Sequence, residues 1–323
     1  MNPVTLSAVV PVFDEIESLP AFHAELVDAL AGLDVSSEVV YVDDGSTDGT
    51  TEELAKLQAN DPGLVRVVVL RRNFGKSGAL AAGFAQARGE LIVTMDADGQ
   101  DVPAELPKLL AEMEAGDHDL VGGWRAARID RAAKRWTSRM YNAATRTFTG
   151  LDLHDFNTGF KLMRREVVDE LPLYGEFHRF FPVLAHDLGF RVSEVAVQHR
   201  PRQAGTSKYL SLLRFPKTML DLLTVLFLTR FADRPLYLFG GVGAALSLIG
   251  FGVMAYLSAL WFAGEGIGTR PLLQFGVLSF LVGVQLIGTG FIGDVLRHSN
   301  ARQEIPYRVR RVLADDGDPG PAT

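Results

Sequence analysis

Cysteine is absent from the sequence, and its absence excludes several classes of protein. Without a thiol the chain can form neither a disulfide framework nor a thiolate metal or redox site, so the composition gives no support to secretion into an oxidising compartment. The N-terminal stretch MNPVTLSAVVPVF also lacks a basic segment followed by a long apolar one, which predicts that no cleavable signal peptide is present.

Positive charge is in the minority, with 32 Lys and Arg against 39 Asp and Glu. Basic residues nevertheless concentrate in two tracts, one from Arg125 to Arg146 and one from His199 to Arg234. A nucleic-acid footprint usually makes a whole domain basic. An acidic chain with two local basic tracts therefore predicts binding of local anions and no binding of nucleic acid.

Charge of either sign is missing from two long segments, Leu236 to Phe262 and Leu272 to Ile292. At about 1.5 Å per residue, each is long enough as a helix to cross a hydrocarbon core of about 30 Å, so both are predicted to span a membrane. Arginines precede the first span and follow the second. The positive-inside rule therefore predicts a multi-pass cytoplasmic-membrane protein whose N-terminal half and both termini are cytosolic. The interrupted apolar stretch at 209–231 is predicted to form interfacial amphipathic helices, in preference to a third span.

The N-terminal half alternates apolar, β-branched runs at 5–13, 38–44, 65–70, 90–97 and 118–124 with helix-like stretches. Runs that are apolar on both faces and separated by helices predict an α/β domain with a mostly parallel sheet. Ligands of such sheets bind beyond the carboxyl ends of the strands. Three of the runs end in acids, which are Asp14 and Glu15, Asp43 and Asp44, and Asp96 and Asp98. These acids are predicted to line a binding cleft at one rim of the sheet.

The stretch VTMDADGQD, at 93–101, concentrates acidic side chains at the end of one apolar run. In an extended chain residues i, i+2 and i+4 face the same side, so Asp96, Asp98 and Gln100 are predicted to present three oxygens to one point. Such hard oxygen ligands favour Mg²⁺ or Mn²⁺ shared with substrate phosphates. Asp101 is placed to cap a helix that begins near Pro103.

Six segments occur in an order that resembles the motif set of family 2 glycosyltransferases. They are VVPVFDE (9–15), VDDGSTDGT (42–50), RNFGKSGAL (72–80), DADGQD (96–101), FNTGFKLMRREV (156–167) and RQAGTSKY (202–209). The sequence most resembles the polyprenyl-phosphate branch, which includes dolichol-phosphate mannosyltransferase and bacterial undecaprenyl-phosphate glucosyltransferases. The resemblance implies a GT-A (Rossmann-like) domain at 1–208, interfacial helices at 209–234, a two-span hairpin at 235–294, and a basic segment with a disordered tail at 295–323.

The resemblance also implies roles for individual residues on the donor side. The residues that would bind the nucleotide sugar end or follow the first, second and fourth apolar runs: Pro11, Phe13, Glu15, Asp43, Asp44 and Asp96. Within this set Asp44 would shape the pocket for the base and ribose. The metal and the donor diphosphate would be held by Asp96, Asp98 and Gln100.

Basic residues are implied on the acceptor side. Candidates for gripping the acceptor phosphate are Arg125, Arg139 and Arg200. Two further residues, Arg202 and Lys208, flank an A-G-T-S turn that would close over the phosphates. Asp155, just before FNTGF, keeps more than one possible role: a general base, or a residue that orients the acceptor or coordinates through water.

The activity implied by the resemblance is inverting, metal-dependent transfer of a hexose from a nucleotide sugar to a polyprenyl phosphate. Because the second pKa of a phosphate is about 6, the acceptor is already ionised and needs no strong base. A metal on Asp96 and Asp98 would offset charge on the leaving diphosphate, while arginines would hold the incoming phosphate. UDP-glucose is the first donor expected, and GDP-mannose is the alternative.

Two rival functions come from other classes of protein. A processive polysaccharide synthase would need a Q-x-x-R-W motif and more spans, and the sequence has neither. A catalytically silent membrane scaffold would have no chemical reason to retain the acidic, glutamine, arginine and lysine set. Association of the spans and interfacial helices into a homo-oligomer is a further hypothesis.

Overall fold

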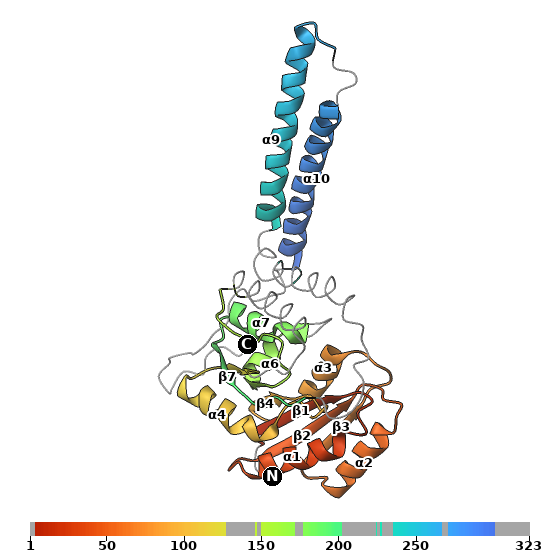
Figure 1. Cartoon of the computed structure of the whole chain (residues 1–323), viewed down its shortest axis with the longest axis vertical. Helices are drawn as coiled ribbons and strands as arrows, with labels where there is room; N and C mark the ends of the chain where they lie inside the picture. The colour runs from red at the N-terminus through yellow and green to blue at the C-terminus, as the bar shows by residue number, and fades with distance from the viewer. Residues whose placement is uncertain are drawn as a thin grey trace. The chain divides into compact units, whose positions relative to one another are not determined.

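The computed structural model of the protein describes residues 4–126, 146, 150–171, 177–201, 224, 227, 235–266 and 271–300. The chain divides into two units, Met1–Val225 and Leu226–Thr323. The first unit is an α/β domain and the second contains two long helices (Figure 1). Almost all of the predicted interfacial segment at 209–234 lies outside the described residues.

A seven-stranded mixed sheet forms the centre of the first unit, in the order β3-β2-β1-β4-β6-β5-β7. Its strands are β1 (Leu6–Val12), β2 (Ser37–Asp43), β3 (Val65–Val69), β4 (Leu91–Thr94), β5 (Leu120–Trp124), β6 (Lys161–Arg164) and β7 (Val192–Ala196). β6 runs antiparallel between β4 and β5, and every other pairing is parallel. The prediction of a mostly parallel sheet is confirmed, and strands β1 to β5 lie within the five predicted runs apart from one residue at the start of β2.

Helices lie on both faces of the sheet. They are α1 (Leu19–Ala31), α2 (Thr50–Asn60), α3 (Lys76–Gln86), α4 (Leu106–Ala115), α6 (Arg165–Glu170) and α7 (Phe181–Asp187), with 3₁₀ turns η1 (Pro103–Glu105) and η2 (Phe177–Phe180). Successive strand residues point to opposite faces, and Val10 of β1 belongs to the core shared with α1. Its neighbour Val9 faces α3, where a Cβ on Gly83 would lie only 2.4 Å from the Val9 Cγ1 atom. Glycine at this position therefore lets α3 lie directly on the sheet.

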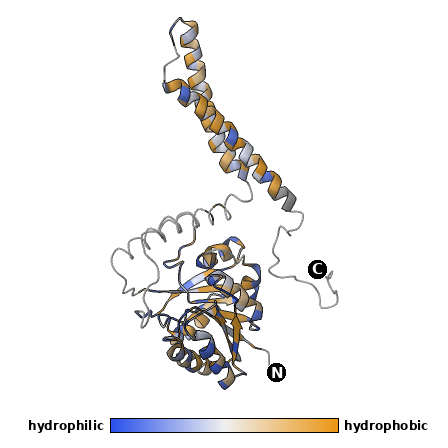
Figure 2. Cartoon of the chain, turned by 90° about the vertical axis from the view of Figure 1, so that its right-hand side faces the viewer, coloured by the Kyte–Doolittle hydropathy of each residue, from blue (hydrophilic) through white to orange (hydrophobic). Residues whose placement is uncertain are grey.

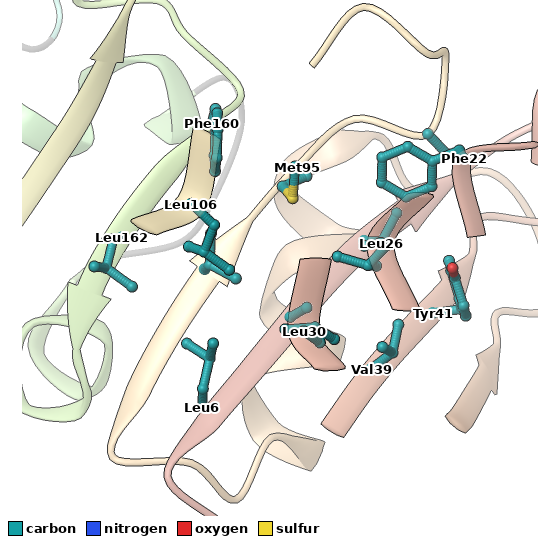
Figure 3. Close-up of a cluster of buried hydrophobic side chains, with 14 of the residues drawn as sticks. Leu6, Phe22, Leu26, Leu30, Val39, Tyr41, Met95, Leu106, Phe160 and Leu162 are labelled. Atoms are coloured by element: carbon teal, nitrogen blue, oxygen red, sulfur yellow. The ribbon is translucent and has the colours of Figure 1, made fainter. Parts of the chain in front are cut away.

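The principal core lies between the sheet and helices α1 and α4. Figure 3 shows Leu6 and Val39 from the strands close to Leu26 and Leu30 of α1. Spacing by three, four and seven residues puts the buried side chains of α1 on one face of that helix. This packed layer fixes the parallel register of β1, β2 and β4, so their carboxyl ends meet at one rim.

The second unit contains α9 (Pro235–Phe262) and α10 (Pro271–Asn300), which match the two predicted spans. The most apolar window of each has a mean hydropathy of 1.9, yet only 11% and 22% of these windows are buried. Figure 2 shows both helices mainly in the hydrophobic colours. Exposed apolar surface of this extent is favourable in contact with lipid and unfavourable in contact with water. The two helices therefore indicate a membrane protein.

Glycines let α9 and α10 approach closely. A Cβ on Gly243 would lie 2.5 Å from the carbonyl oxygen of Gly283, and one on Gly250 would lie 2.6 Å from the carbonyl oxygen of Gly276. Neither distance can accommodate a side chain, so these glycines form a seam of close contact between the two helices.

Candidate active site

Two acids at the end of β2 hold the loops beside the rim. Asp43 is fully buried, and its carboxylate accepts hydrogen bonds from the backbone N–H of Ser46, at 2.9 Å, and from the hydroxyl of Thr51. The Asp44 carboxylate accepts from the successive backbone N–H groups at 74–75, at 2.7 and 2.9 Å. Burial raises the pKa of Asp44, and the adjacent Asp43 adds to the rise although the two backbone donors oppose it. Asp43 and Asp44 thereby fix two loops that border the site.

The residues that end β1 form the neighbouring part of the rim. Pro11 lies within β1, and the Phe13 ring beyond it is 37% exposed. Asp14 takes a left-handed backbone conformation, with φ of 51°, and its carboxylate accepts a hydrogen bond of 2.8 Å from the backbone N–H of Thr47. Glu15 follows, half-buried. An exposed aromatic face beside anchored loops is a suitable surface for a nucleotide base.

The stretch from Asp96 to Gln100 is not extended, so the predicted alternation of its side chains is wrong. Gly99 has a φ of 72° and turns the chain. The Asp98 carboxylate accepts a hydrogen bond of 3.1 Å from the backbone N–H of Gln100. The Gln100 amide nitrogen in turn donates to the carbonyl oxygen of Arg200 at 3.3 Å. Asp96 and Asp98 thus lie at the rim. The hydrogen bond from the Gln100 side chain connects the loop after β4 to the segment after β7.

Asp101 does not cap the helix that follows it. Val102 occupies the capping position of η1, which begins at Pro103 and has no side-chain cap. The Asp101 carboxylate instead accepts a hydrogen bond of 3.0 Å from the backbone N–H of Asp96, and lies 3.7 Å from the Nδ1 atom of His199. Asp101 therefore closes the acidic loop on itself, a role that local capping preferences cannot reveal.

The donor set fits a hard divalent cation when substrate oxygens complete it. The Lys76 ammonium pairs with Asp96, and although burial opposes ionisation, Lys76 outweighs it and lowers the pKa of Asp96. An ammonium at this carboxylate shows that the position attracts a cation. A Cβ on Gly159 would lie 2.6 Å from the Asp96 Oδ2 atom, so glycine keeps that oxygen accessible. Within the described ranges no three His, Asp or Glu side chains cluster closely enough to hold a metal, so substrate phosphates would have to supply further ligands.

Two buried groups near this carboxylate are absent from the residues predicted from sequence. Lys161, at the start of β6, is 2% exposed and donates to the carbonyl oxygen of Thr158. Burial, with repulsion from Lys76, lowers the pKa of Lys161 to about 7. His178 lies with its Nδ1 atom 2.8 Å from the Ser77 hydroxyl, and burial followed by the charge of Lys76 lowers its pKa to about 2. The imidazole is therefore neutral at physiological pH.

Replacing Lys161 by methionine is expected to stabilise the full-length protein most at neutral and lower pH. Burial moves the lysine pKa from 10.5 to about 7, so between these values the unfolded chain binds the proton more strongly. The destabilisation caused by Lys161 is absent above the unfolded pKa, grows as the pH falls, and is complete below the folded pKa. Thermal midpoints of both proteins in detergent, measured near pH 6 and near pH 9, check this. A stabilisation that is equal at the two pH values contradicts it.

Arg125 and Asp155 form a buried bidentate pair. The Arg125 Nε and Nη2 atoms donate to the two carboxylate oxygens of Asp155 at 2.6 and 3.0 Å, and Nη2 also donates to the carbonyl oxygen of Asn157 at 3.1 Å. The side chains are 12% and 4% exposed. Burial disfavours the guanidinium charge, but Asp155 overrides this and raises the pKa of Arg125. Among the described residues, the hydrogen bonds of this guanidinium come from Nε and Nη2 and none comes from Nη1.

Of the remaining predicted basic residues, the structure describes only Arg200. Arg200 makes a bidentate contact with Glu25 of α1, at 2.8 Å to each carboxylate oxygen. Arg139, Arg202 and Lys208 lie outside the described residues. The structure therefore joins two of the predicted acceptor-side residues, Arg125 and Asp155, and the charge of Asp96 contributes to the raised pKa of Arg125.

The comparison with family models defines the class of protein. Residues 7–172 match the model for Glycosyl transferase family 2. This span holds strands β2 to β6, all of β1 except Leu6, and both Asp96 and Asp155. The chain belongs to this family, and the prediction of a glycosyltransferase is confirmed.

Particular relatives extend the likeness through both units. A dodecaprenyl-phosphate galacturonate synthase from Rhizobium johnstonii is 36% identical over 98% of this chain and 95% of its own length. Undecaprenyl-phosphate 4-deoxy-4-formamido-L-arabinose transferases from Pseudomonas aeruginosa and Yersinia pestis are each 37% identical, over 96% and 95% of this chain and 91% and 93% of their own lengths. The chain is thus similar to polyprenyl-phosphate sugar transferases as a whole, its two C-terminal helices included.

Solved structures show the same fold in the first unit. Glucosyl-3-phosphoglycerate synthase from Mycobacterium tuberculosis, in complex with Mn²⁺, UDP-glucose and phosphoglyceric acid, superposes with a TM-score of 0.51. It is 20% identical, and the match covers 70% of this chain and 79% of that one. The complex of the same enzyme with UDP has a TM-score of 0.50. The likeness supports a GT-A-like fold for the α/β domain, as predicted.

Proposed function

We propose that the protein transfers one sugar from a nucleotide sugar to a polyprenyl phosphate at the cytoplasmic face of a membrane. The observation that carries the proposal is the meeting of opposite charges at one rim of the sheet: the carboxylate of Asp96 lies within electrostatic range of the buried Arg125 guanidinium. One anion, the donor diphosphate, needs a cation held by carboxylates, whereas a second anion, the acceptor phosphate, needs a guanidinium. The names of the full-length relatives support a lipid acceptor.

In the proposed mechanism the two sides of the site have separate tasks. Mg²⁺ or Mn²⁺ held by Asp96 and Asp98 would offset the charge that develops on the leaving diphosphate. Arg125 presents Nη1 to the acceptor phosphate, and an oxygen of that ionised phosphate attacks the anomeric carbon on the face opposite the diphosphate, which inverts its configuration. Because the second pKa of the phosphate is about 6, no base has to remove a proton at neutral pH. Asp155, with both oxygens on Arg125, acts as the residue that orients the guanidinium.

The proposed donor is a UDP-sugar. UDP-glucose is the donor expected from the sequence, while the relatives are named for transfer of galacturonate and of 4-deoxy-4-formamido-L-arabinose. Sugar choice depends on a few hydroxyl and carboxylate contacts, so a panel of these three UDP-sugars with GDP-mannose decides it.

The test uses full-length protein in membranes with undecaprenyl phosphate, Mg²⁺ or Mn²⁺, and one radiolabelled donor at a time. The expected result is label in the lipid fraction for one donor, with one sugar per lipid and release of nucleotide diphosphate that requires the lipid. A growing polymer would favour a processive synthase. Absence of label in the lipid fraction with every donor would reject the proposal and would favour the rival function, a catalytically silent membrane scaffold.

The proposed orientation places the α/β domain and both termini in the cytoplasm. It is supported by arginines that flank the two spans and by the paucity of charge between them. Because the native chain has no cysteine, single cysteines introduced near residue 60 and in the loop between the spans give an unambiguous map. A membrane-impermeant thiol reagent applied to intact cells should label only the loop position. Labelling near residue 60 would show that the domain lies on the opposite side of the membrane from the one proposed.

A further inference from the structure

Glu194 of β7 makes an unusual set of contacts beside the Arg125–Asp155 pair. The backbone N–H of His154 donates to both of its carboxylate oxygens, at 2.7 and 2.9 Å, and the backbone N–H of Asp155 donates to its Oε2 atom at 3.1 Å. The His154 ring also contacts the Oε1 atom through Nδ1. The Glu194 side chain is only 11% exposed. One carboxylate therefore holds two successive peptide groups at the turn that carries Asp155.

A second contact ties this turn to the end of β5. The Trp124 and His154 rings stack with their centroids 4.2 Å apart and their planes at 20°. Trp124 immediately precedes Arg125, and His154 immediately precedes Asp155. The ring stack and the bidentate ion pair are therefore neighbouring contacts between the same two segments. Glu194 stands opposite Gly122 in the parallel pairing of β5 with β7. Three segments that are distant in sequence thus converge on one guanidinium.

We infer that Glu194 is a positioning residue for the transfer reaction: it holds the 154–155 turn so that Asp155 fixes the Arg125 guanidinium toward the acceptor phosphate. The inference rests on the proposed function and adds to it a residue that touches neither substrate. Glu194 acts through the turn, because its oxygens contact the peptide groups and the ring of that turn and not Arg125 itself.

The chemistry of the contact explains why a carboxylate is needed. Both Glu194 oxygens accept hydrogen bonds, and a glutamine amide offers one acceptor and one NH₂ donor. Because the backbone N–H of His154 donates to both oxygens, the NH₂ group of glutamine faces that N–H whichever way the amide is turned, and two donors cannot bond to each other. With the NH₂ group at the Oε2 position, the backbone N–H of Asp155 loses its acceptor as well. Glu194→Gln therefore loosens the turn while nearly preserving volume, and Asp155 loses the support that fixes its angle to Arg125.

The expected result for Glu194→Gln in full-length protein is an acceptor KM raised by about tenfold, as for the loss of one ordinary hydrogen bond. The donor KM should stay within about twofold of wild type, because the donor side of the site does not contact Glu194. Radiolabel transferred to undecaprenyl phosphate, measured while each substrate is varied in turn, gives both constants.

Glu112→Met, which removes a hydrogen-bond acceptor while nearly preserving volume, is the matched control. The Glu112 Oε1 atom accepts a hydrogen bond of 2.6 Å from the Ser193 hydroxyl, the residue next to Glu194 on the same strand. This variant weakens the attachment of β7 to α4 without touching the 154–155 turn, so its KM values should match wild type. If Glu194 merely braced β7, the two variants would lower the thermal midpoint alike and neither would change the acceptor KM selectively.

A binding measurement separates failure of this inference from failure of the proposed function. Equilibrium binding of radiolabelled farnesyl phosphate to the full-length protein in detergent requires no catalysis, and Glu194→Gln should weaken it by about tenfold. Wild-type protein that transfers no sugar to lipid overturns the proposed function. Wild-type transfer combined with unchanged acceptor KM and unchanged farnesyl phosphate binding in Glu194→Gln overturns the positioning role alone.

Discussion

Replacement of Asp98 by alanine is expected to reduce sugar transfer by at least about a thousandfold, even at saturating Mg²⁺ or Mn²⁺. Asp96 and Asp98 are the proposed metal ligands, and within the described residues no group of three His, Asp or Glu side chains could hold a metal. Loss of one leaves a single carboxylate to hold the cation under the diphosphate. Transfer of radiolabelled sugar to undecaprenyl phosphate, measured across a metal titration, checks the prediction.

Asp98→Asn distinguishes lost charge from a damaged turn. The Asp98 Oδ1 atom accepts a hydrogen bond from the backbone N–H of Gln100, and an asparagine oxygen can accept the same bond. The turn should therefore survive in Asp98→Asn, with a thermal midpoint close to wild type, while transfer is lost as in Asp98→Ala. Near-normal turnover in either variant would remove Asp98 from the metal site.

The fold was largely predictable because buried parallel strands and membrane spans leave strong patterns. Strands β1 to β5 are apolar runs, and α9 and the part of α10 before Asp294 are long segments without charge. β6 is harder to detect, since the four residues KLMR lead directly into α6 at Arg165 and resemble its first turn. β7, VSEVA, is only half-buried and mixes polar with apolar residues. Both strands depend on pairing with distant segments, which local patterns do not record.

The site residues were predictable as a set, but their orientations were not. Because β2 and β4 both run parallel to β1, Asp44 and Asp96 lie at the same rim. Whether each carboxylate accepts a hydrogen bond from a loop N–H or faces a ligand depends on local turns, such as the one at Gly99. Lys161 and Glu194 were missed for a related reason, because they belong to β6 and β7. The motif FNTGFK does include Lys161, and its final lysine is the one signal in the sequence that could have directed attention there.

Replacement of Arg125 by lysine is expected to lower kcat/KM for the acceptor by at least about a hundredfold, despite the retained charge. The guanidinium makes two parallel bonds to Asp155, and in the proposed mechanism it also offers N–H groups to a phosphate. A lysine ammonium cannot do both. The pair is also buried, so Arg125→Ala would leave Asp155 without its main counter-ion and cost about 3–5 kcal/mol of stability. Transfer kinetics and thermal midpoints in detergent measure the two effects separately.

A double-mutant cycle with Asp155→Asn decides between orientation and base catalysis. If Asp155 orients Arg125, the asparagine variant retains part of the activity, and the Arg125→Lys/Asp155→Asn protein is no worse than Arg125→Lys alone, because both changes break one contact. If Asp155 removes a proton, Asp155→Asn abolishes transfer whatever residue stands at 125, and the two losses multiply. The bidentate geometry and the already ionised acceptor favour the first pattern. Multiplicative losses would return Asp155 to the role of general base and would require Arg125 to act on the phosphate without it.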